Sequence, residues 1–164
     1  MLFRSPALLE YEALLNAAQS AFAQREYVRA HELCVEAVRQ SPKSKEAYQL
    51  MALVMEQQTP PDYRHAVMYL YLASQFHRMD VALWQRIASL ASDAQMFEEA
   101  CLGYRYMLKH GGTDIDRVGT MLRLSQCYEL RRADEKARQV ALDILKLPID
   151  DEHVLDVAVL LYKH

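Results

Sequence analysis

The sequence has few of the residues that break helices. Glycine occurs 4 times and proline 5 times among 164 residues, and the pairs Pro60-Pro61 and Gly111-Gly112 account for four of these nine. The stretches between them are rich in Ala, Leu, Glu, Arg and Gln, which are good helix formers. The chain also lacks any apolar run near the roughly 18–20 residues that span a bilayer. We therefore expect an all-helical protein with no membrane segment.

Neither sign of charge dominates, and cysteines are few. The 19 Lys and Arg residues against 22 Asp and Glu leave a net charge of −3, which argues against a dedicated basic surface for nucleic acid. Cys34, Cys101 and Cys127 are odd in number and contain no CxxC pair, which excludes a secreted disulfide framework. The first six residues lack the charged and then apolar blocks of a signal peptide. An intracellular location is expected.

Prolines and glycines divide the chain into short helical segments. Breaks are expected at Ser41-Pro42, Thr59-Pro60-Pro61, Gly111-Gly112 and Leu147-Pro148. Helices of about 14 residues joined by short turns pack as antiparallel neighbours. The predicted helices lie near residues 5–23, 27–40, 44–57, 61–77, 80–93, 97–110, 114–130, 133–146 and 150–163.

Small and large residues recur at a fixed spacing along these segments. Small residues in the middle of the first helices are separated by 34, 36 and 37 positions: Ala18, Ala52, Ala88 and Ser125. Small residues early in the second helices are separated by 36, 34 and 37: Ala30, Ala66, Ala100 and Ala137. Two further columns keep the same register: Leu14, Tyr48, Trp84 and Met121, then Ala21, Met55, Ala91 and Tyr128. A shared register over four columns indicates a helical repeat array.

The register matches the tetratricopeptide pattern W-x2-L-G-x2-Y…A-x3-F…A…P, through Trp84, Ile87-Ala88, Ala100 and Tyr104 in one unit and closing prolines at 42 and 148. Over residues 11–151 the chain resembles the tetratricopeptide repeat (TPR) family. The resemblance implies an all-α, right-handed TPR superhelix, an α-solenoid of helix-turn-helix hairpins. We expect a lead-in over residues 1–10, units at 11–44, 45–80, 81–114 and 118–151, and a truncated unit at 152–164, as in a fragment of a longer array.

Clusters with possible chemistry have structural explanations. His31 and Cys34 lie three residues apart, but zinc needs three or four ligands and no supporting pair follows. Acids at 150–152 are expected to open a helix, where they complement its dipole. The basic run of Arg131, Arg132, Lys136 and Arg138 is interrupted by acids and is expected to be a solvated face. No catalytic, metal-binding or cofactor-binding residue is therefore assigned. We expect a protein that is not an enzyme and needs no cofactor, the alternative being a helical enzyme domain with an unrecognised site.

The inward sides of the first helices are expected to bind another protein. Chaperone-binding TPR proteins carry Lys and Asn at set groove positions, where this chain has Leu15 and Gln19. A cochaperone or other cytoplasmic adaptor remains the alternative. The mixed polar lining is expected to include Gln19, Phe22, Glu56, Ser92, Gln126 and Glu129. The candidate contact residues are Gln49, Leu53, Gln85, Arg86, Ser89 and Arg123.

A narrower resemblance is carried by the run Leu70-Tyr71-Leu72-Ala73-Ser74-Gln75-Phe76-His77, followed by Asp80, Trp84, Ala88 and Ala100. These residues look like a unit of the TPR subunit of TFIIIC, the factor that recruits the RNA polymerase III machinery. The resemblance implies a nuclear scaffold in transcription initiation that holds protein partners such as TFIIIB components. It also implies that other subunits contact the DNA.

Overall fold

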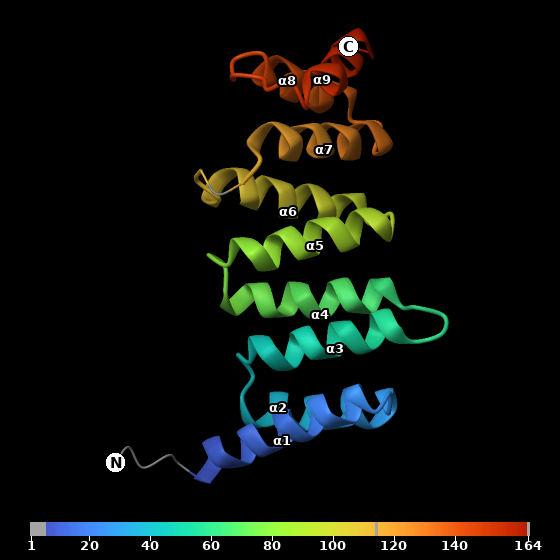
Figure 1. Cartoon of the computed structure of the whole chain (residues 1–164), viewed down its shortest axis with the longest axis vertical. Helices are drawn as coiled ribbons and strands as arrows, with labels where there is room; N and C mark the ends of the chain where they lie inside the picture. Colours follow the sequence, from blue (N-terminus) through green and yellow to red (C-terminus); the bar gives the residue numbers. More distant parts are fainter. Residues whose placement is uncertain (1–5, 114, 164) are drawn as a thin grey trace. The chain divides into compact units, whose positions relative to one another are not determined.

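The structure, a computed structural model, describes residues 6–113 and 115–163. Within these ranges the chain forms nine helices and no strand, as the sequence predicts (Figure 1). The helices are α1 (Pro6–Ala23), α2 (Tyr27–Gln40), α3 (Lys45–Gln57), α4 (Tyr63–Phe76), α5 (Val81–Asp93), α6 (Phe97–His110), α7 (Arg117–Leu130), α8 (Asp134–Ile144) and α9 (Val154–Lys163).

Two helix starts differ from the sequence prediction by three residues or more. The helix expected from 150 begins at Val154, because His153 and Asp150 form a turn in which the Asp150 carboxylate accepts hydrogen bonds from the His153 backbone and ring. The acids at 150–152 therefore precede α9 rather than open it. The helix expected from 114 begins at Arg117, with Asp116 as its N-cap. Residues 1–5 of the predicted lead-in and residue 114 lie outside the described part of the chain.

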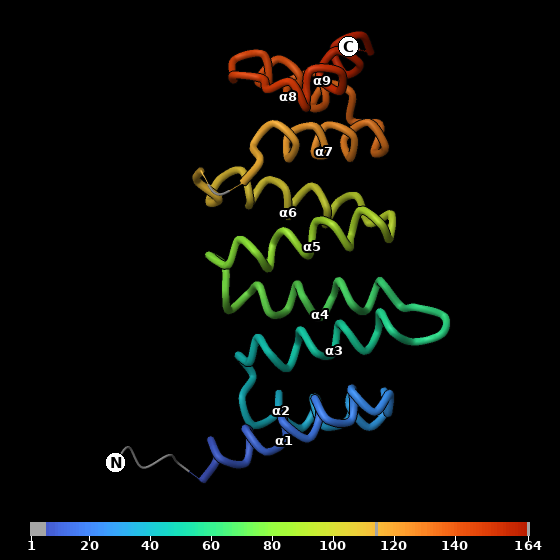
Figure 2. Tube along the Cα trace, viewed as in Figure 1, coloured from blue at the N-terminus to red at the C-terminus, as the bar shows by residue number. Residues whose placement is uncertain are grey.

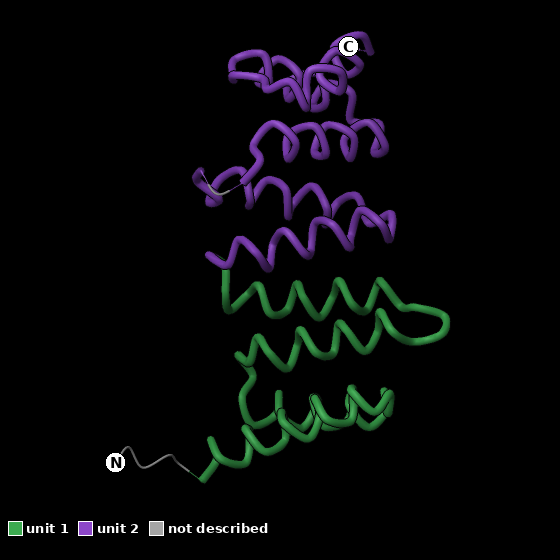
Figure 3. Tube along the Cα trace, in the orientation of Figure 1, with its two compact units in different colours: residues 1–78 green, residues 79–164 purple. Residues whose placement is uncertain are grey.

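Two compact units divide the chain, Met1–Arg78 and Met79–His164 (Figure 3). In the first unit α1 packs on α2, α2 on α3, and α3 on α4. In the second unit α5 packs on α6, α6 on α7 and α7 on α8, and α9 contacts both α7 and α8. The trace in Figure 2 follows these neighbouring helices as successive hairpins.

The two predicted columns of small residues are fully buried. The eight residues are 0% exposed: Ala18, Ala52, Ala88 and Ser125 in the first helices, and Ala30, Ala66, Ala100 and Ala137 in the second. Small side chains at these points let the two helix backbones approach closely. The α5–α6 crossing is especially close, because a Cβ atom on Gly103 would lie 2.8 Å from the Cβ of Ala88. The spacing of the small residues in the sequence therefore corresponds to buried positions in the packed helices.

Three of the hairpin turns share one backbone conformation. Arg25, Gln95 and Arg132 each follow the first helix of a hairpin with a left-handed φ of 62°, 59° and 55°. In each case the following amide donates to the carbonyl five residues earlier, as from Glu26 to Ala21. This is the Schellman ending of a helix, which satisfies carbonyls that the helix leaves unpaired.

Candidate protein-binding surface

The six predicted contact residues lie on three first helices. Gln49 and Leu53 are half-buried on α3 in the first unit. In the second unit Gln85 and Ser89 are exposed and Arg86 is half-buried on α5, and Arg123 is exposed on α7. None is a core residue, so each one keeps some surface for a partner. Their role in binding stays a prediction.

A pocket of about 310 Å³ joins α5, α6 and α7 in the second unit. It brings Ser89 and Arg123 together, although these residues are far apart in the sequence. Ser92 and Gln126, also expected on the inward side, line the same pocket, whereas Gln85 and Arg86 are not among its lining residues. The full lining is Ser89, Ser92, Asp93, Tyr104, Arg123, Gln126, Cys127 and Leu130. The inward faces of α5 and α7 therefore share one cavity.

Tyr104 connects the walls of this α5–α7 pocket. Its hydroxyl is hydrogen-bonded to Ser92 and to Arg123, and its side chain is buried. Burial raises the pKa of Tyr104, so the hydroxyl remains protonated at neutral pH and can hold both partners in place. The sequence pattern marks Tyr104 only as a repeat-column residue, because helical phase alone does not reveal which second-helix side chain reaches the groove.

The pocket's polar groups can form hydrogen bonds and charge contacts. It offers one guanidinium (Arg123), one carboxylate (Asp93), two serine hydroxyls, an amide, the Tyr104 hydroxyl and the Cys127 thiol. These groups bind peptide polar atoms and side chains through hydrogen bonds and single charge contacts. Leu130 adds an apolar side chain at the same pocket. A partner segment with mixed polar and apolar side chains fits this lining.

The cysteines have two distinct environments. Cys34 is completely buried, and burial raises its pKa to about 12. The thiols of Cys101 and Cys127 are hydrogen-bonded to each other, and that bond, with Arg131 and Arg105 nearby, lowers the pKa of Cys101 to about 7. The pKa of Cys127 is raised, first by the same hydrogen bond and then by burial. The sequence alone treats all three as small core residues, since it does not show that α6 and α7 bring two of them together.

The other clusters considered in the sequence have structural roles. The His31 ring is hydrogen-bonded to the Tyr69 hydroxyl at 2.9 Å, which accounts for its half-buried position. Among the described residues no group of three or more His, Cys, Asp and Glu side chains is arranged to hold a metal ion. Arg131 forms an ion pair with Glu98 at 3.2 Å, and His153 joins Asp150 to Asp116.

In the described ranges no helix combines the length and hydropathy needed to cross a bilayer.

Comparison with known proteins identifies the fold. No protein-family profile matches the chain. A structure of MamA from strain AMB-1 superposes with a TM-score of 0.61 at 16% identity, covering 88% of this chain and 78% of MamA. The PilF structure from Pseudomonas aeruginosa gives a TM-score of 0.52 at 16% identity, covering 97% of this chain and 71% of PilF. Both neighbours are TPR proteins, so the predicted all-α TPR fold is confirmed.

One curated protein is similar in sequence. The human general transcription factor 3C polypeptide 3 is 26% identical over 147 residues, which cover 88% of this chain. The chain spans only 16% of the length of that protein. The similarity agrees with the predicted resemblance to a TFIIIC subunit and concerns one part of a much longer relative.

Proposed function

Starting from a chain with a TPR fold, we propose that it is a protein-interaction scaffold and not an enzyme. The observation that carries this proposal is the α5–α7 pocket, where Ser89 and Arg123 face one cavity with hydrogen-bonding groups and no catalytic arrangement among its lining residues. TPR hairpins bury one side of each helix and leave the other side for a partner. The proposal includes the four repeat units at 11–44, 45–80, 81–114 and 118–151 and the further unit from 152.

The more specific part of the proposal is a role in TFIIIC. Similarity to the human general transcription factor 3C polypeptide 3 supports a nuclear protein that helps assemble the RNA polymerase III initiation complex. Its partners would be protein components such as those of TFIIIB. The net charge of −3 supports a protein partner over direct contact with DNA, because phosphate binding draws on an excess of Lys and Arg.

A binding experiment tests both parts of this proposal. Purified TFIIIB components are titrated onto the chain by calorimetry, and the substitution Arg123→Ala is expected to weaken binding about tenfold, or 1.4 kcal/mol. The matched control is Arg39→Ala, which removes an exposed arginine of α2 that pairs with Glu36 and is not among the lining residues of the pocket. Circular dichroism checks that both variants keep wild-type helicity.

The outcomes distinguish the general proposal of a protein-interaction scaffold from the specific proposal of a role in TFIIIC. If no TFIIIB component binds but another protein is captured through Arg123, the scaffold stands and the TFIIIC assignment is wrong. Tight binding of a chaperone carboxy-terminal peptide would favour the adaptor alternative. If Arg123→Ala and Arg39→Ala bind every partner equally well, the α5–α7 pocket is not the contact surface. The double substitution Gln85→Ala with Arg86→Ala then tests the remaining predicted residues of α5.

A further inference from the structure

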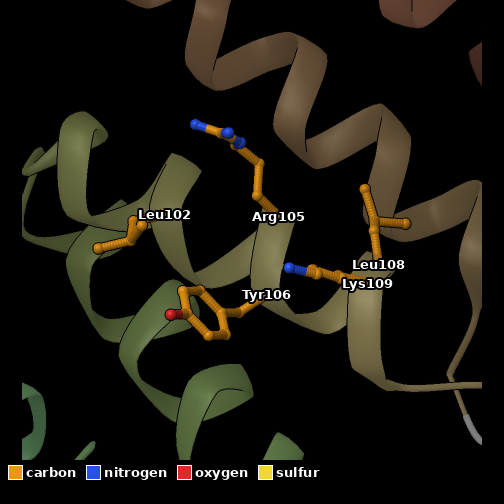
Figure 4. A pocket seen from close by; sticks show the side chains of 5 residues that line it. All are labelled: Leu102, Arg105, Tyr106, Leu108 and Lys109. Carbon is orange, nitrogen blue, oxygen red and sulfur yellow. The ribbon is translucent and has the colours of Figure 1, made fainter. Parts of the chain in front are cut away.

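The second unit has another pocket, on the outer side of α6. Its volume is about 430 Å³, and it is lined by Leu102, Arg105, Tyr106, Leu108 and Lys109. Figure 4 shows the five lining side chains on α6, where Leu108 leaves the helix in a different direction from Leu102, Tyr106 and Lys109. The spacing of these residues explains this arrangement, because positions three and four apart share one face of a helix. None of these residues lines the α5–α7 pocket.

The lining of this outer pocket is basic and rigid. Arg105 and Lys109 contribute two positive charges, and none of the lining residues within 6–113 and 115–163 carries a carboxylate. Within the described ranges neither cation takes part in an ion pair. The Tyr106 ring stacks on Trp84 at a centroid distance of 4.2 Å and an interplanar angle of 12°, so it is held in place as a wall. A ligand with a negative charge therefore meets a preformed site.

A neighbouring pocket of about 380 Å³ extends this surface across α7 and α8. Leu108 lines both pockets, so the two are neighbours that share this residue. Arg117, which lines the second pocket, donates from its guanidinium to the Leu108 carbonyl at 3.0 Å. The lining of the second pocket is mainly apolar: Leu108, Arg117, Met121, Leu124, Val140, Asp143, Lys146 and Leu147.

We infer that these two pockets form a docking surface for an acidic peptide segment that carries large apolar side chains. Among the described lining residues, the cations are Arg105, Lys109, Arg117 and Lys146, and the carboxylate is that of Asp143. That carboxylate is paired with Lys146 at 2.7 Å, which leaves the surface with an excess of positive charge. The chain as a whole has a net charge of −3, so this local excess departs from its average composition.

The apolar residues identify the ligand as a peptide rather than a nucleic acid. Leu102, Leu108, Leu124, Val140 and Leu147 line the two pockets together with Met121 and Tyr106. Met121 and Leu124 are buried, whereas Leu102, Leu108, Val140 and Leu147 are half-buried and keep some apolar surface. A phosphate backbone would pair with the four cations but would leave this remaining apolar surface without a partner. An acidic segment with leucine or phenylalanine at helical or alternate spacing satisfies both parts of the surface. This inference does not depend on the TFIIIC assignment, because it rests on the second unit alone.

Fluorescence anisotropy with a labelled peptide of about 15 residues tests the inference. The probe alternates Asp or Glu with Leu and Phe, and two control peptides replace its acids with Gln or its apolar residues with Ser. The full chain is compared with the double variant Arg105→Glu and Lys109→Glu. The matched control is Arg29→Glu with Arg39→Glu, which makes the same charge change at exposed arginines of α2.

We expect the α6 double variant to raise the Kd of the probe at least about tenfold, and the α2 double variant to leave it unchanged within about twofold. Both control peptides bind more weakly than the probe, and raising the salt concentration weakens the probe's binding. Equal loss in the two double variants would overturn the inference, because it would indicate a general charge effect.

Three further results would also overturn it. The first is the absence of probe binding to the wild type at about 1 mM peptide. The second is equal binding of the probe and the peptide that carries Ser in place of its apolar residues. The third is tighter binding of a single-stranded RNA of about 15 nucleotides, which would assign the surface to nucleic acid. Circular dichroism and thermal unfolding confirm that each variant is folded before binding is compared.

Discussion

The second hairpin (α3–α4) and the third (α5–α6) fill the same repeat positions in different ways. The large residue that opens the first helix is Tyr48 in the second hairpin and Trp84 in the third, and both are buried. Three positions after the small residue of the second helix, the second hairpin has Tyr69 and the third has Gly103. Tyr69 reaches back to His31 on α2, whereas Gly103 brings α6 against the backbone of α5.

The connections of the two hairpins also differ. In the second hairpin, residues 58–62 connect α3 to α4. The Asp62 side chain caps α4 by accepting a hydrogen bond from the His65 amide. The third hairpin turns over residues 94–96 through the left-handed Gln95, and its N-cap Met96 makes no side-chain cap. The second helices of the two hairpins thus differ: α4 has a polar side-chain cap, whereas α6 has a close backbone contact with α5.

The largest effect is expected at the α5–α6 crossing. Ala88→Leu places three extra carbon atoms against the Gly103 backbone, so it should lower the free energy of unfolding by about 3 kcal/mol, near the upper end for overpacking. Ala52→Leu in the second hairpin should cost about 1–3 kcal/mol, because that site is equally buried but faces no glycine contact of this kind.

Urea unfolding followed by circular dichroism measures both changes. The control is Ala82→Leu, at an exposed position of α5, which adds the same atoms without a helix crossing. If Ala88→Leu unfolds at the same urea concentration as Ala82→Leu, the close crossing is not a source of stability and the comparison fails.

The next largest change in the free energy of unfolding is expected for a substitution of Gly103. Glycine inside a helix is normally worse than alanine by about 1 kcal/mol. Gly103→Ala should nevertheless destabilise the chain by about 1 kcal/mol, because the new Cβ would lie 3.0 Å from the Trp84 carbonyl oxygen as well as close to Ala88. The melting temperature should fall, and the near-ultraviolet circular dichroism of Trp84 should change. A rise in melting temperature would show that α5 and α6 can separate without cost.

The cap of α4 in the second hairpin should contribute a similar amount to the free energy of unfolding. Asp62→Ala removes the cap of α4 and should cost about 1 kcal/mol at neutral pH. The pKa of Asp62 is lowered, first by the hydrogen bond from the His65 backbone and then by the His65 side chain. A lowered carboxyl pKa stabilises the fold above the unfolded-state value of 3.8 and loses that contribution as pH falls through the folded-state value.

A pair of variants isolates this pH effect. The stability difference between wild type and Asp62→Ala should be constant near pH 7 and should shrink below about pH 4. Asp62→Asn keeps a capping oxygen, so it should retain most of the stability at neutral pH and lose the pH dependence. A difference between wild type and Asp62→Ala that does not change down to pH 2 would show that the charge of Asp62 has no role in the cap.

The smallest effect is expected at the turn of the third hairpin. Gln95→Gly should stabilise the chain by about 0.5 kcal/mol, because glycine adopts the left-handed φ of 59° without a steric penalty. The same direction is expected for Arg25→Gly and Arg132→Gly at the equivalent turns. As a control, Gln24→Gly changes a neighbouring residue outside the left-handed positions and should not stabilise. Thermal unfolding of the set distinguishes a repeated backbone rule from a property of one turn.

The repeat spacing predicted the hairpins because helix-breaking residues and buried small residues act locally. Ala18 and Ala137 occur in phase with the helix, so their burial follows from the sequence pattern. The start of α9 was placed too early because the His153–Asp150 turn competes with the helix for the same backbone groups. The predicted contact residues Ser89 and Arg123 lie at one pocket, but Tyr104, which orients Arg123, comes from the second helix and has no separate signal in the sequence.

The helical class, the hairpin register and the buried small residues follow from the sequence, because they depend on periodicity and on residues close together in the chain. Which side chains from different helices meet depends on the tertiary structure. It brought Cys101 to Cys127, Tyr104 to Arg123, and the cations of α6 to the apolar surface of α7 and α8. The physical reason is that charge, burial and hydrogen bonding at a site depend on the rotation of each helix against its neighbours, which the packing of whole side chains determines.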